Sequence, residues 1–408
     1  MASSSQTSNR LDYLDAARAL ALLLGIVFHA SLSFMPMFIG WAVMDISTSN
    51  IVAIFVMISH SFRMELFFLI AGFFSHMTLQ KKGIRTFIST RIMRIGLPLL
   101  IGWFILRPML VSGWIMGAES MRGDTDIANA LTQGLASLKD LPGGFLVGTH
   151  LWFLYYLLLI PALTLFVCSM VSLNDKVKHT LSASMDCLVT WLCRSSFAPF
   201  LVVLPIGSCL WFMSHWGMDT PDKSLIPNLP VLFVYTGFFS FGWLMNRQKQ
   251  QIQYFAKITW SKIIICLSAT VLTVILTSFQ SQLGHPHYHL LKIVFVLNYA
   301  LMMWTLVSLF IGLCFRSFNR LNHVIRYLAD ASYWLYLIHL PIVIWLQIAF
   351  AEIDSHWSFK LFGICTITVV LSLTLYELFV RSTIIGRVLN GRKKPRVLQL
   401  TANSKVKA

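Results

Sequence analysis

Residues 51–78 read IVAIFVMISHSFRMELFFLIAGFFSHMT, a stretch that is apolar over most of its length. A helix of about 20 apolar residues is enough to cross the hydrocarbon core of a bilayer. The whole chain shares this character, because 57% of its 408 residues are hydrophobic and only 12% are charged. Soluble domains carry about twice that share of charge. The composition therefore excludes an ordinary soluble protein and indicates a membrane protein.

Similar apolar stretches on both sides of residues 51–78 predict about ten transmembrane helices and no large domain outside the membrane. The predicted fold class is all-α, a polytopic membrane protein with a transmembrane domain over residues 1–388. Residues 389–408 are polar and basic, which is typical of a disordered cytoplasmic tail attracted to anionic lipid heads. The predicted spans are roughly 18–40, 51–78, 94–116, 146–170, 198–216, 229–246, 261–281, 291–315, 328–350 and 358–380.

Lys and Arg are distributed unequally over the predicted loops. If both termini are cytoplasmic, the outer loops hold few cations, and most lie in the inner loops and the tail, as in the group from Lys81 to Arg94. Cytoplasmic loops collect Lys and Arg, so the chain is predicted to be N-in, C-in. The same rule accounts for the net charge of +16 without a nucleic acid partner.

Neither disulfides nor a metal site is predicted. The seven cysteines show no CxxC spacing. The outer loop HPHYH, with His285, His287 and His289, carries metal-ligating side chains. Alternating histidines in a short outer loop are more often solvated than bound to metal, so this loop is interpreted as a solvated turn.

The first predicted span places two ionisable residues on one helix face. Arg18 and His29 are eleven residues apart, which is about three turns and about 16 Å along the axis. An arginine at the cytoplasmic mouth can bind phosphate, and an imidazole near mid-membrane can take a proton from a hydroxyl. The alternatives are a positive-inside anchor for Arg18 and an interhelical hydrogen bond for His29.

The second predicted span holds His60, Arg63 and Glu65 at about the depth of His29. Arg63 and Glu65 are two residues apart, so they point to different sides of the helix and cannot pair with each other. Each needs a partner from another helix. Cross-helix salt bridges are one interpretation, and a substrate pathway or an active site is the other.

Arg91 and Arg94 lie one turn apart before the third span and, with Arg18, can form a landing site for phosphates. The alternative is a topology signal that also contacts lipid heads. His150 and Trp152 open the fourth span on the outer side. Trp152 can stack on a polar substrate there or belong to the interfacial aromatic belt.

The ninth span carries a polar stripe on an otherwise apolar helix. Ser332, Tyr336 and His339 are spaced by four and three residues and so share one face, with His339 near mid-membrane. In the tenth span, Glu377 and Arg381 are four residues apart and are best explained as an intrahelical pair.

Five sequence blocks occur in an order that is typical of one family: Arg18 with His29, SFRMELFFLIAGFFS, the pair Arg91 and Arg94, THLWFL, and SYWLYLIHLP. With these blocks the chain resembles the membrane acyltransferase family 3 from about residue 11 to 381. Within this family it most resembles the succinyltransferases of osmoregulated periplasmic glucans. The resemblance implies a ten-helix enzyme of the bacterial inner membrane that uses cytoplasmic acyl-coenzyme A and acylates a sugar hydroxyl on the periplasmic side.

The resemblance also implies roles for individual residues. Arg18 and His29 occupy the family's essential Arg/His motif, and Arg91 and Arg94 its conserved basic pair. The second span departs from the pattern, because this chain has Glu65, and Ala71 before a glycine, where related sequences often carry an uncharged residue and Ser. The departure leaves the donor preference open.

Residues and resemblance together predict acyl-coenzyme A, with succinyl-coenzyme A preferred, as donor substrate and no permanently bound cofactor. His29 would deprotonate the sugar hydroxyl, which then attacks the thioester directly or a transient acyl-histidine. His60, Arg63 or His150 would stabilise the oxyanion, and His339 completes the predicted catalytic set.

Three alternatives remain: an O-acetyltransferase acting on another cell-surface polysaccharide, an exporter of acylated saccharide, and a structural partner of a glucan synthase. The absence of a visible internal repeat weakens the exporter. The predicted partners are acyl-coenzyme A, a periplasmic glucan or similar polysaccharide, the lipid bilayer and a glucan synthase.

Overall fold

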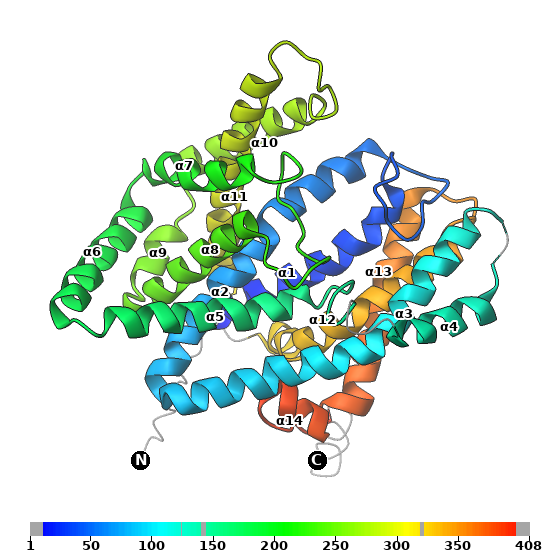
Figure 1. Ribbon diagram of the computed structural model, residues 1–408, viewed down its shortest axis with the longest axis horizontal. Helices are drawn as coiled ribbons and strands as arrows, with labels where there is room; N and C mark the ends of the chain where they lie inside the picture. Colours follow the sequence, from blue (N-terminus) through cyan, green and yellow to red (C-terminus); the bar gives the residue numbers. More distant parts are fainter. Residues whose placement is uncertain (1–10, 124, 140–143, 319–321, 397–408) are drawn as a thin grey trace, which may run out of the picture.

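The computed structural model describes residues 11–123, 125–139, 144–318 and 322–396 (Figure 1). Every regular element in these ranges is helical, which confirms the all-α prediction. The α-helices are α1 (Asp12–Ser31), α2 (Asn50–Arg91), α3 (Leu97–Ser120), α4 (Ile127–Ala136), α5 (Trp152–Val171), α6 (Asp175–Arg194), α7 (Ala198–Trp211), α8 (Leu229–Arg247), α9 (Gln251–Phe255), α10 (Trp260–Thr277), α11 (Tyr288–Ser317), α12 (His323–Phe350), α13 (Trp357–Leu375) and α14 (Ile384–Asn390). Short turns are 3₁₀ at η1 (Leu32–Phe34) and η3 (Ser137–Lys139), and π-helical at η2 (Ile92–Gly96) and η4 (Tyr376–Val380).

Eight helical stretches in the described part of the chain are long and apolar enough to cross a membrane, or nine if the bent pair α6 and α7 is counted as one. One of the eight is the continuous stretch Asn50–Ser120, 71 residues long, which contains both the second and the third predicted spans. Gly83 breaks it with φ 73° and ψ 170°, a conformation that glycine adopts without steric cost. The chain bends here, so the helix leading to η2 runs along the lower edge of the molecule (Figure 1).

The fifth predicted span, 198–216, is wrong as an independent crossing. Helix α7 has only 14 residues, or about 21 Å of helix, and it is bent by 112° from α6. It ends at Trp211 because the carboxylate of Asp219 accepts hydrogen bonds from the backbone N–H groups of Ser214 (2.7 Å) and His215 (3.2 Å) and turns the chain.

Helices α2 and α8 pack with their backbones in contact. A β-carbon on Gly72 would clash with the carbonyl group of Phe239, and one on Gly242 would clash with that of Leu69. Small residues allow membrane helices to approach this closely. The contact fixes α2, which carries His60 and Arg63, against the half of the molecule formed by α7, α8 and α11.

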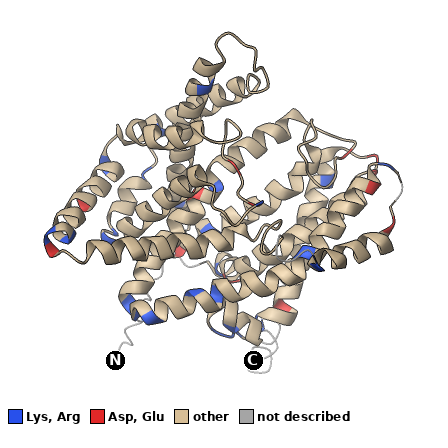
Figure 2. Ribbon diagram, in the orientation of Figure 1, with Lys and Arg blue, Asp and Glu red and all other residues tan. Residues whose placement is uncertain are grey.

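The two ends of the described chain meet at one end of the molecule. Asp15 and Arg18 near the start of α1 line the same cavity as Asn390, which ends α14, and Arg392, which follows it. Figure 2 shows Lys and Arg along this lower edge, on the segment that leads into η2 and near α14. This arrangement is what an N-in, C-in chain requires, although which side is cytoplasmic stays a prediction.

Part of the predicted tail contacts the bundle. Residues 389 and 390 end α14, and residues 391–396 after it are held by Lys394, which pairs with Asp330, and by Arg396, whose guanidinium donates to the carbonyl oxygen of Leu378 (2.9 Å). This part of the predicted tail therefore packs on the membrane-embedded helices, and residues 397–408 lie outside the described residues.

Candidate active site

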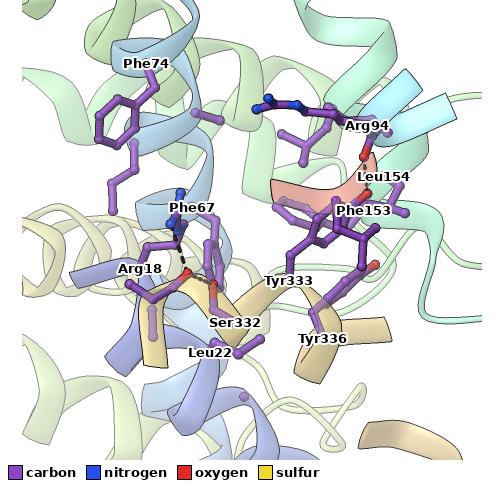
Figure 3. Close-up of a pocket in the computed structure, with 18 of the residues that line it drawn as sticks. Arg18, Leu22, Phe67, Phe74, Arg94, Phe153, Leu154, Ser332, Tyr333 and Tyr336 are labelled. Carbon is purple, nitrogen blue, oxygen red and sulfur yellow. Dashed lines mark hydrogen bonds between the residues drawn. The ribbon is translucent and has the colours of Figure 1, made fainter. Parts of the chain in front are cut away.

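A cavity of about 610 Å³ connects the basic end of the molecule with the histidines of the helix bundle. At one end its lining includes Arg18, Arg91 and Arg94, and at the other His29 and His339. The stretch between them is mostly apolar. Figure 3 shows Arg94 with Phe153 and Leu154 at one side, and Phe74, Phe67 and Arg18 at the other.

All eight predicted site residues line this cavity: Arg18, His29, His60, Arg63, Arg91, Arg94, His150 and His339. They come from α1, α2, η2, α12 and the turn before α5. Trp152, Ser332 and Tyr336 line it as well. Residues from segments far apart in sequence are thus brought to one internal space, while the chemical role of each stays a prediction.

His29 lies between two aromatic rings at the inner end. Its ring is stacked near Trp41, with centroids 5.8 Å apart and an interplanar angle of 18°, and lies 5.3 Å from the ring of His339. Its Nδ1 is buried and has no hydrogen-bond partner. An imidazole with a nitrogen left unpartnered beside a cavity retains the capacity to accept a proton.

The backbone around His29 is held by Gln347 from α12. The side-chain amide of Gln347 donates to the carbonyl oxygens of His29 (2.9 Å) and Ala30 (3.0 Å), and its own oxygen accepts from Nε1 of Trp41 (2.9 Å). One buried amide therefore links the candidate base to the ring that stacks on it.

His339 and His150 are oriented by backbone carbonyl groups. Nδ1 of His339 donates to the carbonyl oxygens of Leu335 (3.1 Å) and Tyr336 (2.8 Å). Nε2 of His150 donates to those of Tyr336 (3.0 Å) and Leu337 (3.1 Å). A neutral imidazole has one N–H, so each ring keeps its other nitrogen as an acceptor. The two rings lie 5.3 Å apart.

Arg63 forms no ion pair within the described ranges. Its guanidinium carbon lies 4.2 Å from the ring centroid of Phe28, and its Nη1 is buried without a hydrogen-bond partner. Glu65 is fully buried, and both of its carboxylate oxygens lack hydrogen-bond partners. The cross-helix salt bridges considered for these two residues are absent, and only Arg63 of the pair lines the cavity.

The basic mouth is assembled around the π-helical turn η2. Arg91 caps this turn and donates to the hydroxyl of Ser75, and Arg94 lies within it. Tyr333 donates its hydroxyl hydrogen to the carbonyl oxygen of Arg94 (2.5 Å). Arg18 pairs with Asp15 (3.3 Å) and donates to the carbonyl oxygen of Ala329 (3.2 Å), as Figure 3 shows for the second contact. Neighbouring groups therefore hold the side chains of Arg18 and Arg91 and the backbone of Arg94.

The loop between α7 and α8 covers the outer end of the site. Thr220 lines the cavity, and His60 donates through Nε2 to the carbonyl oxygen of Met218 (2.9 Å). The carbonyl oxygen of Asp222 accepts from the N–H of Gly148 (3.0 Å), and burial raises the pKa of the Asp222 carboxyl against the opposing effect of the neighbouring Lys223. This loop ties the second and fourth predicted spans together at the site.

Several residues of the site were not singled out from the sequence. Trp41 and Gln347 flank His29, Thr220 lies in the covering loop, and Arg392 and Lys394 belong to the predicted tail. Gln347 could have been recognised from the sequence, because it is an amide side chain within the apolar stretch PIVIWLQIAF. The other residues have no such signal, because loop and tail residues carry no periodicity that points inward.

Other charged groups of the bundle serve contacts away from the cavity. Lys360 and Asp45 form a buried ion pair (2.8 Å). The predicted pair of Glu377 and Arg381 is observed at 3.7 Å. Among the described residues, no group of three or more His, Cys, Asp or Glu side chains is arranged to hold a metal ion.

A family model described as an acyltransferase domain matches the sequence over residues 11–377. The chain belongs to acyltransferase family 3. Its similarity to relatives extends over nearly the whole length: it is 25% identical over 398 residues to "Glucans biosynthesis protein C" of Escherichia coli strain K12, covering 93% of this chain and 94% of the relative. The protein of the same name from Salmonella paratyphi A is 24% identical over 401 residues, covering 97% and 98%.

No solved structure matches this chain. The family assignment therefore depends on sequence, and the helical architecture agrees with it. This member of acyltransferase family 3 is a multi-pass membrane acyltransferase, as the sequence blocks predicted.

Proposed function

We propose that this acyltransferase moves an acyl group from a coenzyme A thioester, held at the basic mouth, to a sugar hydroxyl that reaches His29 from the outer side. The observation that carries the proposal is the single cavity with three arginines at one end and His29, His339 and Arg63 at the other. Arginine binds phosphates through paired hydrogen bonds, and the apolar stretch between suits the arm that carries the thioester. A saccharide exporter would need polar groups along that stretch.

The proposed reaction needs one base and one oxyanion donor. His29 takes the proton of the sugar hydroxyl as its oxygen attacks the thioester carbonyl, the C–S bond breaks, and the proton passes to the leaving thiolate. Transfer through an acyl-histidine would use the same atoms in two steps. His339, next to His29, offers its Nε2 as an acceptor that can orient the His29 ring.

Arg63 is the best of the three predicted oxyanion donors. His60 and His150 already give their ring N–H groups to carbonyl oxygens, so their remaining nitrogens can only accept while the rings are neutral. Arg63 has an unpartnered N–H group at the same end of the cavity. Donors that point at developing negative charge supply a large part of the catalytic effect.

Succinyl-coenzyme A is the proposed donor. A succinyl group carries a free carboxylate, and an unpaired charge within the membrane is costly. Arg63 forms no ion pair with the described residues and could neutralise that carboxylate with its planar guanidinium. Acetyl transfer is the competing form of the same chemistry. An acetyl group has no free carboxylate, so Arg63 would then stabilise only the oxyanion.

Glucan is the proposed acceptor, since the name of the full-length relatives connects them with glucan biosynthesis. The proposed location is the bacterial inner membrane, with glucan on the periplasmic side. The test uses purified protein in lipid nanodiscs with periplasmic glucan and either succinyl- or acetyl-coenzyme A, and detects acylated sugar by mass spectrometry. Succinylated glucan in a time-dependent yield supports the proposal. Acetylated product alone would refute the donor, and no acylated product with either donor would refute the reaction.

A further inference from the structure

A second cavity of about 240 Å³ borders the first on the basic side of the molecule. The two cavities share Asp330, Arg392 and Lys394. The second cavity is lined by His323, Arg326, Tyr327, Asp330, Arg381, Arg392 and Lys394. Neither the family nor the predicted donor site accounts for it.

The cations of this cavity have hydrogen-bonding capacity left over. The guanidinium groups of Arg326 and Arg392 form no hydrogen bond or ion pair with other described residues, and the backbone N–H of Arg326 donates to the carbonyl oxygen of Asn322 (3.0 Å). The Arg381 side chain is only 10% exposed, and its Nη1 is buried without a partner. A buried donor without an acceptor costs free energy, so the geometry favours an anion that would supply acceptors here.

The carboxylates nearby do not cancel this charge. Asp330 pairs with Lys394, and Glu377 lies 3.7 Å from Nε of Arg381 and accepts from the hydroxyl of Tyr327 (3.2 Å). The charged side chains at this cavity are therefore four cations, three arginines and one lysine, and two carboxylates. The excess charge is positive, and it is concentrated next to the mouth that already holds Arg18, Arg91 and Arg94.

The segment after α14 forms one wall of the second cavity through Arg392 and Lys394. Gly391 adopts φ 79° and ends α14 in the left-handed conformation, which glycine adopts readily. The N–H of Lys394 then donates to the carbonyl oxygen of Arg381 (3.0 Å), and Nε of Arg381 donates to that of Pro395 (2.7 Å). These contacts hold Arg392 where it borders both cavities.

We infer that the second cavity binds a phosphate ester of the donor nucleotide, apart from the phosphates held at the mouth. This inference rests on the proposed function and extends it. Coenzyme A carries phosphate at two separate places, a diphosphate on the arm and a monophosphate on the ribose. Two adjacent basic cavities match two separate phosphates, and the ribose monophosphate is the group assigned to Arg326, Arg381 and Arg392. An anionic lipid head shares this phosphate chemistry, so the test separates the two sources.

The experiment measures binding of coenzyme A and of 3′-dephospho-coenzyme A to the full chain in nanodiscs of zwitterionic lipid, by calorimetry. The wild-type protein should prefer coenzyme A by about tenfold or more, as expected for hydrogen bonds to a charged group. The double variant Arg326→Gln with Arg381→Gln, two residues that line only the second cavity, should lose this preference and keep its affinity for the dephospho form. Arg387→Gln is the matched control, because Arg387 is exposed on α14 and lines neither cavity.

Three results would overturn the inference in different ways. An undiminished preference in the double variant would show that the monophosphate binds elsewhere, while the proposed function would stand. Failure of the wild-type protein to bind either compound would refute the proposed function together with the subsite. A second measurement uses nanodiscs with added phosphatidylglycerol. If the wild-type protein shows no preference for coenzyme A in zwitterionic discs, and retains more phosphatidylglycerol than the double variant does, then the cavity is a lipid-head site and the inference is overturned.

Discussion

The two ends of the main cavity differ in how their polar groups are satisfied. At the mouth, Arg18 and Arg91 each donate to a side-chain or backbone acceptor, and among the described residues only Nε of Arg18 is buried there without a partner. At the inner end, Nδ1 of His29, His60 and His150 and Nη1 of Arg63 are all buried without partners. Such groups cost free energy unless something binds them. The comparison indicates that the mouth holds its arginine side chains in position to bind a ligand, whereas the inner end leaves buried nitrogen atoms available to a substrate.

The largest effect is expected at the inner end. His29→Ala should lower acyl transfer by about 10² to 10⁴, because a positioned general base contributes that much. Glucan acylation is measured by mass spectrometry, and donor binding by calorimetry should stay near wild type. His76→Ala is the matched control, since this buried histidine bonds to Asn246 and does not line the cavity. Wild-type acylation by the His29 variant would show that the inner end is not catalytic.

Arg63→Gln should change which donor is used. If Arg63 binds the succinyl carboxylate, the ratio of succinyl to acetyl transfer should fall by about 10- to 100-fold, the range expected for a hydrogen bond to a charged group. Competition between the two donors in one reaction gives the ratio directly. An equal loss with both donors would assign Arg63 to the oxyanion or the fold instead.

At the mouth, Arg91→Ala and Arg94→Ala should each raise KM for the donor by about tenfold and lower kcat less. Phosphate contacts far from the thioester stabilise ground and transition states alike. Steady-state kinetics at varied donor concentration separate the two constants. Arg85→Ala is the control, because Arg85 is an exposed residue of the same segment that does not line the cavity. A fall in kcat at constant KM would contradict this prediction, because the mouth would then affect the chemical step as the inner end is expected to do.

The smallest effect is expected from Gln347, which positions His29 without lining the cavity. Gln347→Ala should lower kcat about fivefold at unchanged KM, since a neutral hydrogen bond contributes about 1 kcal/mol. Trp345→Phe removes a hydrogen bond of the same helix to the carbonyl oxygen of Met109 and serves as control. A rise in KM alone would argue against positioning of the base.

Much of this arrangement could be predicted from local sequence. Apolar length located the helices, and the spacing of Arg18 and His29 placed them along one helix at the two ends of the cavity. The site required contacts between helices that spacing does not encode. Trp41 meets Gln347 across 306 residues of sequence, so neither residue could be connected with His29 beforehand.

The fifth predicted span failed for a related reason. The stretch 198–216 is apolar, but its end is set by hydrogen bonds from Asp219, which folds the following loop over the site. Hydropathy measures composition and does not register such a turn. In the same way, the basic composition of residues 389–396 does not show that Arg392 and Lys394 reach the cavity.

The close packing of α2 on α8, with Gly72 against Phe239 and Gly242 against Leu69, restricts how the molecule can move. Each of these glycines lies directly against a backbone carbonyl group of the facing helix. If the helices slid or tilted past each other, backbone atoms of one would clash with those of the other. Helix α2 therefore acts as a fixed wall, and the space for an entering or leaving substrate has to come from the opposite side of the cavity. The segment after α14 lines the cavity at its basic end and the loop between α7 and α8 lines it at the histidine end, so an opening would have to form at these two connecting segments and not at the wall that carries Arg63.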